Sequence, residues 1–180
     1  MPTTLIVGTN TYVTLAEAEE WAGNRLMMDA WNNATGAQQE AALLMACQAI
    51  ERLDPAGWDG TPTTTTQKVQ WPRFGVTDRT KTTYNWAPGY GYGYFFDSAT
   101  MPQPLKDAQC EEALELLKQN ADPGHQGVVR DLAKGIAAIS VFRSSITYGV
   151  IVRFGGTLYS KDAWGLCSDL RRVKPVRLRP

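Results

Sequence analysis

Few residues in this sequence could perform acid–base or nucleophilic chemistry, and they are scattered. The single histidine, His125, lies in a turn-like Asp122-Pro123-Gly124-His125 segment with no nucleophile motif nearby, so a surface turn is favoured over catalysis. The carboxylates of Glu111, Glu112 and Glu115 flank a leucine stripe, a pattern typical of the solvent-facing side of a helix. The chain is therefore expected not to be an enzyme, and no catalytic, metal-binding or cofactor-binding residue is predicted.

Glycine and tyrosine alternate from Gly89 to Tyr94, but this run has neither the GxGxxG spacing nor the lysine of a phosphate-binding loop. Its rings could stack on single-stranded nucleic acid beside a basic groove, although only Arg79 and Lys81 lie near it in the sequence. Tyrosine equally suits protein interfaces, because it buries a large area at low entropic cost. A protein contact is favoured, and the candidate contact residues are Tyr84, Trp86, Tyr90, Tyr92, Tyr94 and Phe95.

The end of the chain is basic and interrupted by proline, which predicts an extended arm outside the core. Such an arm attracts phosphate backbones without sequence preference. It suits an acidic surface of another subunit equally well, and a merely solvated terminus is a third reading. The candidate contacts to a partner protein or a neighbouring subunit are Arg171, Arg172, Lys174, Arg177 and Arg179.

The formal net charge of zero conceals a gradient along the chain. Residues 1–60 carry two basic side chains against eight acidic ones, whereas residues 123–180 carry ten basic against three acidic. This segregation suggests ends that meet different surfaces or copies that stack head to tail, unless the fold brings both ends together and cancels the field.

The hydrophobic content of 43% is that of a soluble globular protein, and the length suits one domain over residues 1–180. No apolar run is long enough to span a bilayer, and the first residues lack a signal-peptide pattern. Cys47, Cys110 and Cys167 lie far apart without CxxC spacing, which predicts buried thiols in a reducing compartment.

Three helices are expected to form the core that positions these segments. The capping box Thr14-Leu15-Ala16-Glu17 predicts a helix from about Leu15 to Trp31. A second box at Thr35 opens a helix that Asp54-Pro55 ends. Pro102 opens the third. The predicted fold is mainly α, a small helical bundle over about residues 11–120 with a long aromatic loop inserted at 74–101.

The loop contains one fixed point, the triplet Trp71-Pro72-Arg73. Pro72 favours an extended Trp71, Trp71 can bury its ring against the helices, and Arg73 can pair with a carboxylate on a neighbouring helix or subunit. These residues are assigned a structural role as the anchor of the loop. Aromatic residues at this density argue against simple disorder, so the loop is interpreted as a contact arm.

The last part of the chain, about residues 126–180, gives a mixed signal. Val128 to Phe142 fits a helix, but the β-branched residues that follow favour extended segments broken at Ser144-Ser145, so a C-terminal β-hairpin is predicted. Ser160 is expected to cap a last short helix ahead of the basic arm.

Four stretches recur in the order and spacing of a known family. They are Tyr12 to Ala18, Ala30-Trp31 with Ala41-Ala42-Leu43 and Ala49-Ile50, Gln67 to Arg73, and Pro102 to Leu117. On these residues the chain resembles the phage head-tail adaptor proteins, also called connector or head-completion proteins, which are often labelled DnaT-like single-stranded-DNA-binding proteins. The likeness covers most of residues 11–120, and the Gly/Tyr-rich insertion after Arg73 departs from the family.

The resemblance implies a structural adaptor of a tailed double-stranded DNA bacteriophage, assembled in the host cytoplasm and located in the virion neck. Such proteins form a ring, typically of twelve copies, under the portal protein and dock a stopper or tail-completion protein. Double-stranded DNA would pass through the ring without sequence recognition, with no cofactor or membrane involved, and the basic tail would insert against the portal. The family label leaves one alternative, a single-stranded-DNA-binding replication accessory protein.

Overall fold

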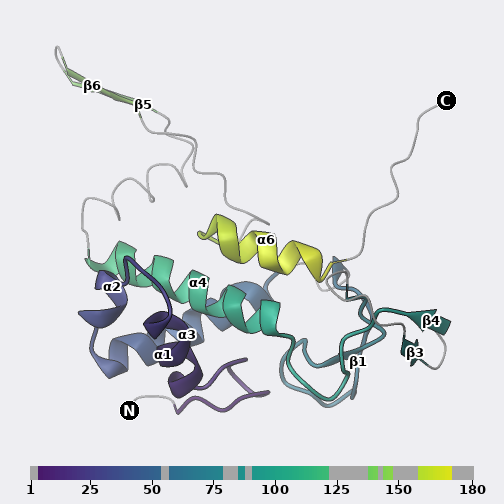
Figure 1. Ribbon diagram of the computed structural model, residues 1–180. Helices are drawn as coiled ribbons and strands as arrows, with labels where there is room; N and C mark the ends of the chain where they lie inside the picture. The colour runs from purple at the N-terminus through teal and green to yellow at the C-terminus, as the bar shows by residue number, and fades with distance from the viewer. Residues whose placement is uncertain are drawn as a thin grey trace, which may run out of the picture.

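Helices form the larger part of the fold, which confirms the predicted mainly α class (Figure 1). The computed structural model describes residues 4–53, 57–78, 85–87, 91–121, 138–141, 144–147 and 158–171. The helices are α1 (Leu15–Gly23), α2 (Asp29–Asn32), α3 (Gly36–Glu51), α4 (Gln103–Ala121) and α6 (Lys161–Asp169). The strands are β1 (Thr61–Pro62), β2 (Arg73–Phe74), β3 (Asn85–Ala87), β4 (Gly91–Gly93), β5 (Ala138–Val141) and β6 (Ser144–Thr147).

Both predicted capping boxes are present. At α1 the Thr14 hydroxyl accepts from the Glu17 amide at 3.1 Å, and the Glu17 carboxylate accepts from the Thr14 amide at 2.8 Å. The helix then ends at Gly23 instead of continuing to Trp31, because Gly23 and Asn24 are residues that favour a helix end. Met27, in the link to α2, adopts φ of 61°, the left-handed region that non-glycine residues rarely occupy.

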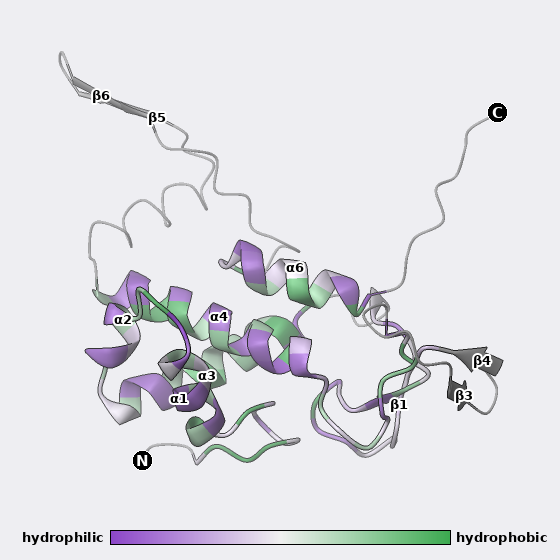
Figure 2. Ribbon diagram, viewed as in Figure 1, coloured by the Kyte–Doolittle hydropathy of each residue, from purple (hydrophilic) through white to green (hydrophobic). Residues whose placement is uncertain are grey.

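Helix α4 is the central element, because α1, α2, α3 and α6 all pack on it. One apolar cluster lies among α1, α2, α3 and α4 and contains Trp31 and Leu43. A second lies among α3, α4, α6 and the loop after α3, and contains Trp58 and Trp71. Figure 2 shows both hydrophobic and hydrophilic residues within each of the long helices α3 and α4, as helices with one face in the core require.

A buried amide fixes the first cluster. The Gln109 side chain is fully buried, and its Oε1 accepts from the Tyr12 backbone amide at 2.8 Å. Its Nε2 donates to the Thr11 hydroxyl at 2.7 Å and to the Leu43 carbonyl at 2.9 Å. One side chain on α4 therefore joins the segment before α1 to the middle of α3, and its own burial is compensated by hydrogen bonds.

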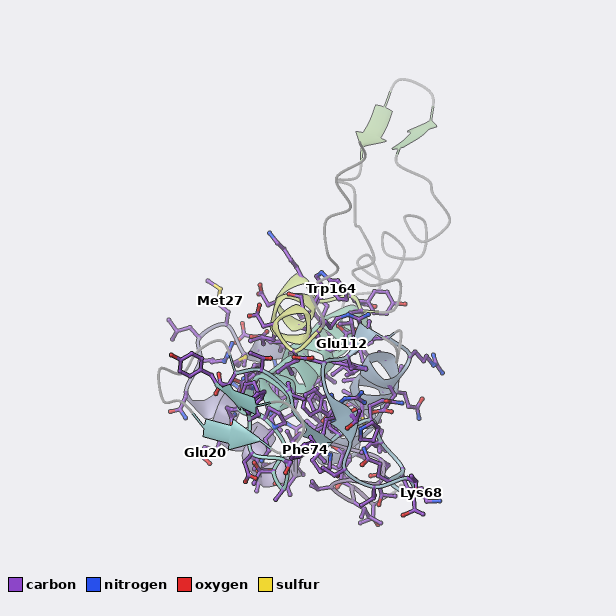
Figure 3. All side chains as sticks on the ribbon, turned by 90° about the vertical axis from the view of Figure 1, so that its right-hand side faces the viewer. Glu20, Met27, Lys68, Phe74, Glu112 and Trp164 are labelled. Atoms are coloured by element: carbon purple, nitrogen blue, oxygen red, sulfur yellow. The ribbon has the colours of Figure 1, made fainter. Side chains whose placement is uncertain are left out.

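Glu112 holds α6 on α4, contrary to the expectation that it faces solvent. Its exposed fraction is 0%, whereas Glu111 and Glu115 are partly exposed. The Glu112 carboxylate accepts hydrogen bonds from the backbone amides of Tyr159, at 3.0 and 3.1 Å, and Ser160, at 2.8 Å. Figure 3 shows Glu112 in the interior close to α6. Burial raises the pKa of Glu112 above its ordinary value of 4.5, while the two amides favour the ionised form.

Ser160 caps α6 as expected, since its hydroxyl accepts from the Ala163 amide at 3.1 Å. The predicted C-terminal hairpin is also present, with β5 and β6 paired antiparallel from Ala138 opposite Thr147 to Val141 opposite Ser144. The aromatic loop predicted over 74–101 contains a short hairpin that the sequence analysis did not identify. Strands β3 and β4 pair antiparallel there, with Trp86 opposite Tyr92. Pro88-Gly89 between two aromatic runs was the unused hairpin signal.

Substituting Glu112 tests its role in docking α6. Glu112→Ala leaves the buried amides of Tyr159 and Ser160 without their acceptor, so we expect a loss of about 2 kcal/mol or more in the free energy of unfolding. The matched control is Glu115→Ala on the same helix, which removes a surface pairing with Lys118 at 3.7 Å and should cost under about 1 kcal/mol. Urea denaturation measures both, and equal losses would contradict the assigned role.

Because the pKa of Glu112 is raised in the folded protein, the free energy of unfolding should depend on pH in a definite direction. The folded protein holds a proton on this carboxyl more tightly than the unfolded chain does, so the group's contribution to stability is complete below pH 4.5 and is lost as the pH rises through the raised folded pKa. Glu112→Gln lacks this titration. The wild-type protein should therefore lose stability relative to Glu112→Gln between pH 4.5 and neutrality in a denaturation series. A relative gain over that range would show that the pKa is not raised.

Candidate partner-binding site

The loop after α3 is fixed by two tryptophans in edge-to-face contact. Trp58 and Trp71 are both fully buried, with ring centroids 5.8 Å apart and ring planes at 86°. Aromatic rings favour this arrangement because the positive edge of one meets the negative face of the other. Trp71 thus lies in the core of the loop, and the peptide bond from Trp71 to Pro72 is cis. We refer to Trp58, Asp59, Trp71, Arg73 and Arg171 as the Trp58 cluster.

Arg73 connects the anchor triplet to the chain on either side of it. Its side chain is 5% exposed and donates from Nε to the Asp59 carbonyl at 2.8 Å and from Nη2 to the Gly60 carbonyl at 2.9 Å. Its Nη1 donates to the Gln70 carbonyl at 3.4 Å. Nη1 also donates to the side-chain Oε1 of Gln70 at 3.3 Å, so these hydrogen bonds join Arg73 to oxygens of the same loop. The guanidinium nevertheless acts on a carboxylate electrostatically, that of Glu51.

Glu51, the last residue of α3, ties the triplet to the helical core. Its carboxylate accepts from the Gln70 backbone amide at 2.9 and 3.1 Å and from the Tyr12 hydroxyl. Burial raises the pKa of Glu51, and the Gln70 amide and the Arg73 charge oppose the rise. The Trp71 segment, the end of α3 and the segment before α1 therefore meet at one carboxylate.

Arg171 begins the basic tail, and the structure packs it into the fold. Its guanidinium carbon lies 5.4 Å from the Trp58 ring centroid and 5.7 Å from the Trp164 ring centroid, within range of cation–π attraction. A Cβ at Gly57 would meet this guanidinium, so any larger residue there would have to displace the end of the Arg171 side chain. The backbone joins here as well, because the Asp59 amide donates to the Leu170 carbonyl at 3.1 Å.

We call residues 77–96 of the aromatic loop the aromatic segment. Its two ends are fixed beside Trp58 and Asp59. The Asp59 carboxylate accepts from the Thr77 amide at 3.1 Å, the Asp78 amide donates to the Tyr94 carbonyl at 2.5 Å, and the Phe96 amide donates to the Val76 carbonyl at 3.0 Å. Asp59 therefore bonds both to the start of the aromatic segment and to the residue before Arg171. Figure 1 shows β3, β4 and the C-terminal end of α6 at one end of the molecule.

The structure thus brings together the points where the two predicted contact segments, the aromatic segment and the basic tail, leave the folded core. Tyr94 and Phe95 are half-buried at the base of the aromatic segment, and the backbone of Trp86 pairs with that of Tyr92 in the β3–β4 register. Tyr84, Tyr90, Arg172, Lys174, Arg177 and Arg179 lie outside the described residues. Sequence reasoning missed Trp58 and Asp59, although a tryptophan inside Gly57-Trp58-Asp59-Gly60 was a usable signal of a residue packed where the chain turns closely.

Among the residues that the structure describes, the charged side chains at the ends of the aromatic segment do not form a phosphate-binding groove. Asp59, Asp78 and Asp97 surround the start and end of the aromatic segment, and Asp78 is fully buried. Arg73 and Arg171 direct their guanidinium groups at carbonyls and indole rings of the same chain. A nucleic-acid site needs accessible cations along the backbone path, so this base suits a protein contact better.

The remaining reactive groups in the described part of the chain do not assemble into a centre. No set of three or more His, Cys, Asp or Glu side chains there is placed to hold a metal ion. Burial raises the pKa of Cys47, Cys110 and Cys167 to about 12 in each case, so the thiols stay protonated at neutral pH. Within the same residues, every helix is too short or too polar to cross a bilayer.

Trp71→Ala tests the structural role of the triplet. The change removes a fully buried indole and its contact with Trp58, so we expect the free energy of unfolding to fall by about 3–5 kcal/mol. The control, Trp21→Ala, removes a half-buried indole from the cleft between α1 and α4 and should cost less. Thermal unfolding measures both variants. An unchanged melting temperature for Trp71→Ala would refute the structural assignment.

Comparison with known proteins gives one match. Residues 3–133 match the model of a family described as "Putative DnaT-like ssDNA binding protein". The matched range includes α1 to α4, the Trp58–Trp71 pair and the aromatic segment. No curated protein and no solved structure matches the chain.

Proposed function

From the premise that the chain belongs to the DnaT-like ssDNA-binding protein family, we propose that it is a structural head-to-tail adaptor of a tailed double-stranded DNA bacteriophage. Copies would form a ring under the portal protein, extend the DNA channel and dock a stopper or tail-completion protein. The aromatic segment and the basic tail are the contact elements, and the helical core holds them in place.

The observation that supports this proposal is the meeting of the two segments at Asp59. One carboxylate oxygen binds the Thr77 amide, and the backbone amide of the same residue binds the Leu170 carbonyl. Residues about a hundred positions apart in the sequence are thereby fixed at one end of the core (Figure 1). A partner that contacts both the aromatic segment and the basic tail would find their attachment points already ordered by the fold. Less conformational entropy would then be lost on binding.

The chemistry of the base favours a protein as that partner. Its described carboxylates would repel phosphates, and its two arginines are engaged within the chain. Half-buried Tyr94 and Phe95 offer instead the aromatic surface that is enriched in protein interfaces.

A second candidate function is single-stranded-DNA binding in replication. The family description favours it, and so does the meeting of an aromatic segment with a tail that carries four basic residues after Arg171. Base stacking on the rings and phosphate contacts from the tail would then act together. The two candidates differ in the salt dependence and the identity of the partner.

Truncation after Arg171 separates the candidates. Removing residues 172–180 leaves Arg171 between Trp58 and Trp164, so we expect an unchanged melting temperature. Binding to the phage's portal protein, measured by light scattering after size exclusion, should weaken at least about tenfold, which corresponds to about 1.4 kcal/mol. Lys161→Ala, at an exposed position at the start of α6, is the control and should bind as the wild type does.

The same proteins are then titrated against a fluorescent oligothymidine at two salt concentrations. The adaptor function predicts weak binding of this probe beside a clear portal complex. Tight, salt-sensitive oligonucleotide binding that the truncation abolishes, with no portal complex for the full chain, would replace the adaptor by the replication function.

A further inference from the structure

A mainly polar cleft of about 420 Å³ lies between α1 and the N-terminal half of α4. Two of its carboxylates, those of Glu20 on α1 and Asp107 on α4, have no cationic partner within the described part of the chain. Asp107 accepts a hydrogen bond from the Gln103 side-chain amide at 2.8 Å. Trp21 also lines the cleft, and its buried Nε1 has no hydrogen-bond partner among the same residues. Two carboxylates and one unsatisfied donor suit a cationic chain segment with free backbone carbonyls.

The two cations that line the cleft are already paired. The Arg25 guanidinium binds the Glu111 carboxylate and lies 4.2 Å from the centroid of the Trp21 ring. The Lys106 ammonium binds the Glu17 carboxylate. An anionic ligand would have to displace these carboxylates, whereas a cationic ligand meets the carboxylates that remain. The charge of the cleft therefore favours a basic occupant.

The basic tail has the matching chemistry beyond Arg171. Residues 172–180 carry four basic side chains and no acidic one. Lys174-Pro175 and Arg179-Pro180 predict an extended backbone, because proline disfavours helical geometry in the residue before it. An extended segment of this kind leaves its carbonyls unbonded, and proline-containing segments dock in clefts lined by aromatic side chains.

The tail also begins close enough to reach the cleft. Arg171 packs near Trp58, which shares one apolar cluster with Tyr12 and with Leu105 at the start of α4. Val13, the residue after Tyr12, lines the cleft. Nine extended residues span about 30 Å, more than twice the roughly 10–12 Å diameter of an α-helix. Residues 172–180 are therefore long enough to pass the start of α4 and enter the cleft.

We propose that the basic tail folds back on its own chain and docks in the α1–α4 cleft, as a latch that opens when a partner protein takes the tail. Its cations would lie beside Glu20 and Asp107, and one of its carbonyls would accept from Trp21 Nε1. Because the tail is tethered, its effective concentration at the cleft is on the order of millimolar, so a weak contact keeps it docked. The inference rests on the proposed function for the identity of the partner, but the docking itself does not.

Tryptic release of residues 178–180 from the full chain tests the docking. Trypsin cuts after Arg177 but not after Lys174 or Arg179, because proline follows each of them. Mass spectrometry of the intact protein gives the initial rate of release, and a docked tail is protected. Glu20→Gln combined with Asp107→Asn keeps the side-chain sizes and removes the two charges, so the rate should rise about fivefold.

The matched control combines Glu19→Gln with Glu40→Gln. It changes the net charge by the same amount at positions that do not line the cleft, so the rate should stay that of the wild type. Equal rates for the wild type and the cleft variant, or an equal rise in the control, would overturn the proposal. Protection should also be independent of protein concentration. Its loss on dilution would place the tail in the cleft of another copy and would overturn the latch.

The release assay contains neither portal nor DNA, so its outcome is separate from the proposed function. If both hold, the cleft variant should bind the portal protein about fivefold more tightly than the wild type, because its tail is more often free. A protected tail in a protein that fails to bind portal would support the latch and reject the adaptor function. Portal binding by a protein whose tail is not protected would support the adaptor function and reject the latch.

Discussion

Trp58 is the residue on which the arrangement of the contact segments depends. Its ring lies in edge-to-face contact with Trp71 and within cation–π range of the Arg171 guanidinium, and its neighbour Asp59 bonds to Thr77 and Leu170. These contacts require full burial of an indole outside the regular helices. The loop after α3, the aromatic segment and the start of the basic tail consequently share one fixed reference point.

The helical core and this reference point are connected through α4 and the end of α3. Glu112 fixes α6, which carries Arg171 at its far end, and Glu51 fixes the segment that carries Trp71. Glu112 is buried and Glu51 is half-buried, and burial raises the pKa of each carboxyl group. The fold therefore uses these two carboxyl groups to hold α6 and the Trp71 segment on the helical core. Backbone amides that donate to each group lower the cost of its desolvation.

Local sequence signals predicted the starts of the helices well, but they missed the break between α1 and α2 and the contacts of the loop. The boxes at Thr14 and Thr35 and the cap at Ser160 are short-range patterns, so they could be read directly from neighbouring residues. Glu112 was misassigned because its burial comes from α6, some 47 positions later, and not from its own helix. The contacts of Trp58 and Asp59 are likewise long-range, and helical or strand periodicity carries no information about them.

The two main fastening side chains, Glu112 and Arg73, bind backbone amides and backbone carbonyls. Recognition of this kind does not depend on which side chains the bonded residues carry. The docking of α6 and of the loop therefore depends on a few side chains, and it does not depend on the side chains of the residues whose backbone they bind. A different sequence could therefore stand between Thr77 and Phe96 while the side chains that fasten α6 and the loop keep their bonds.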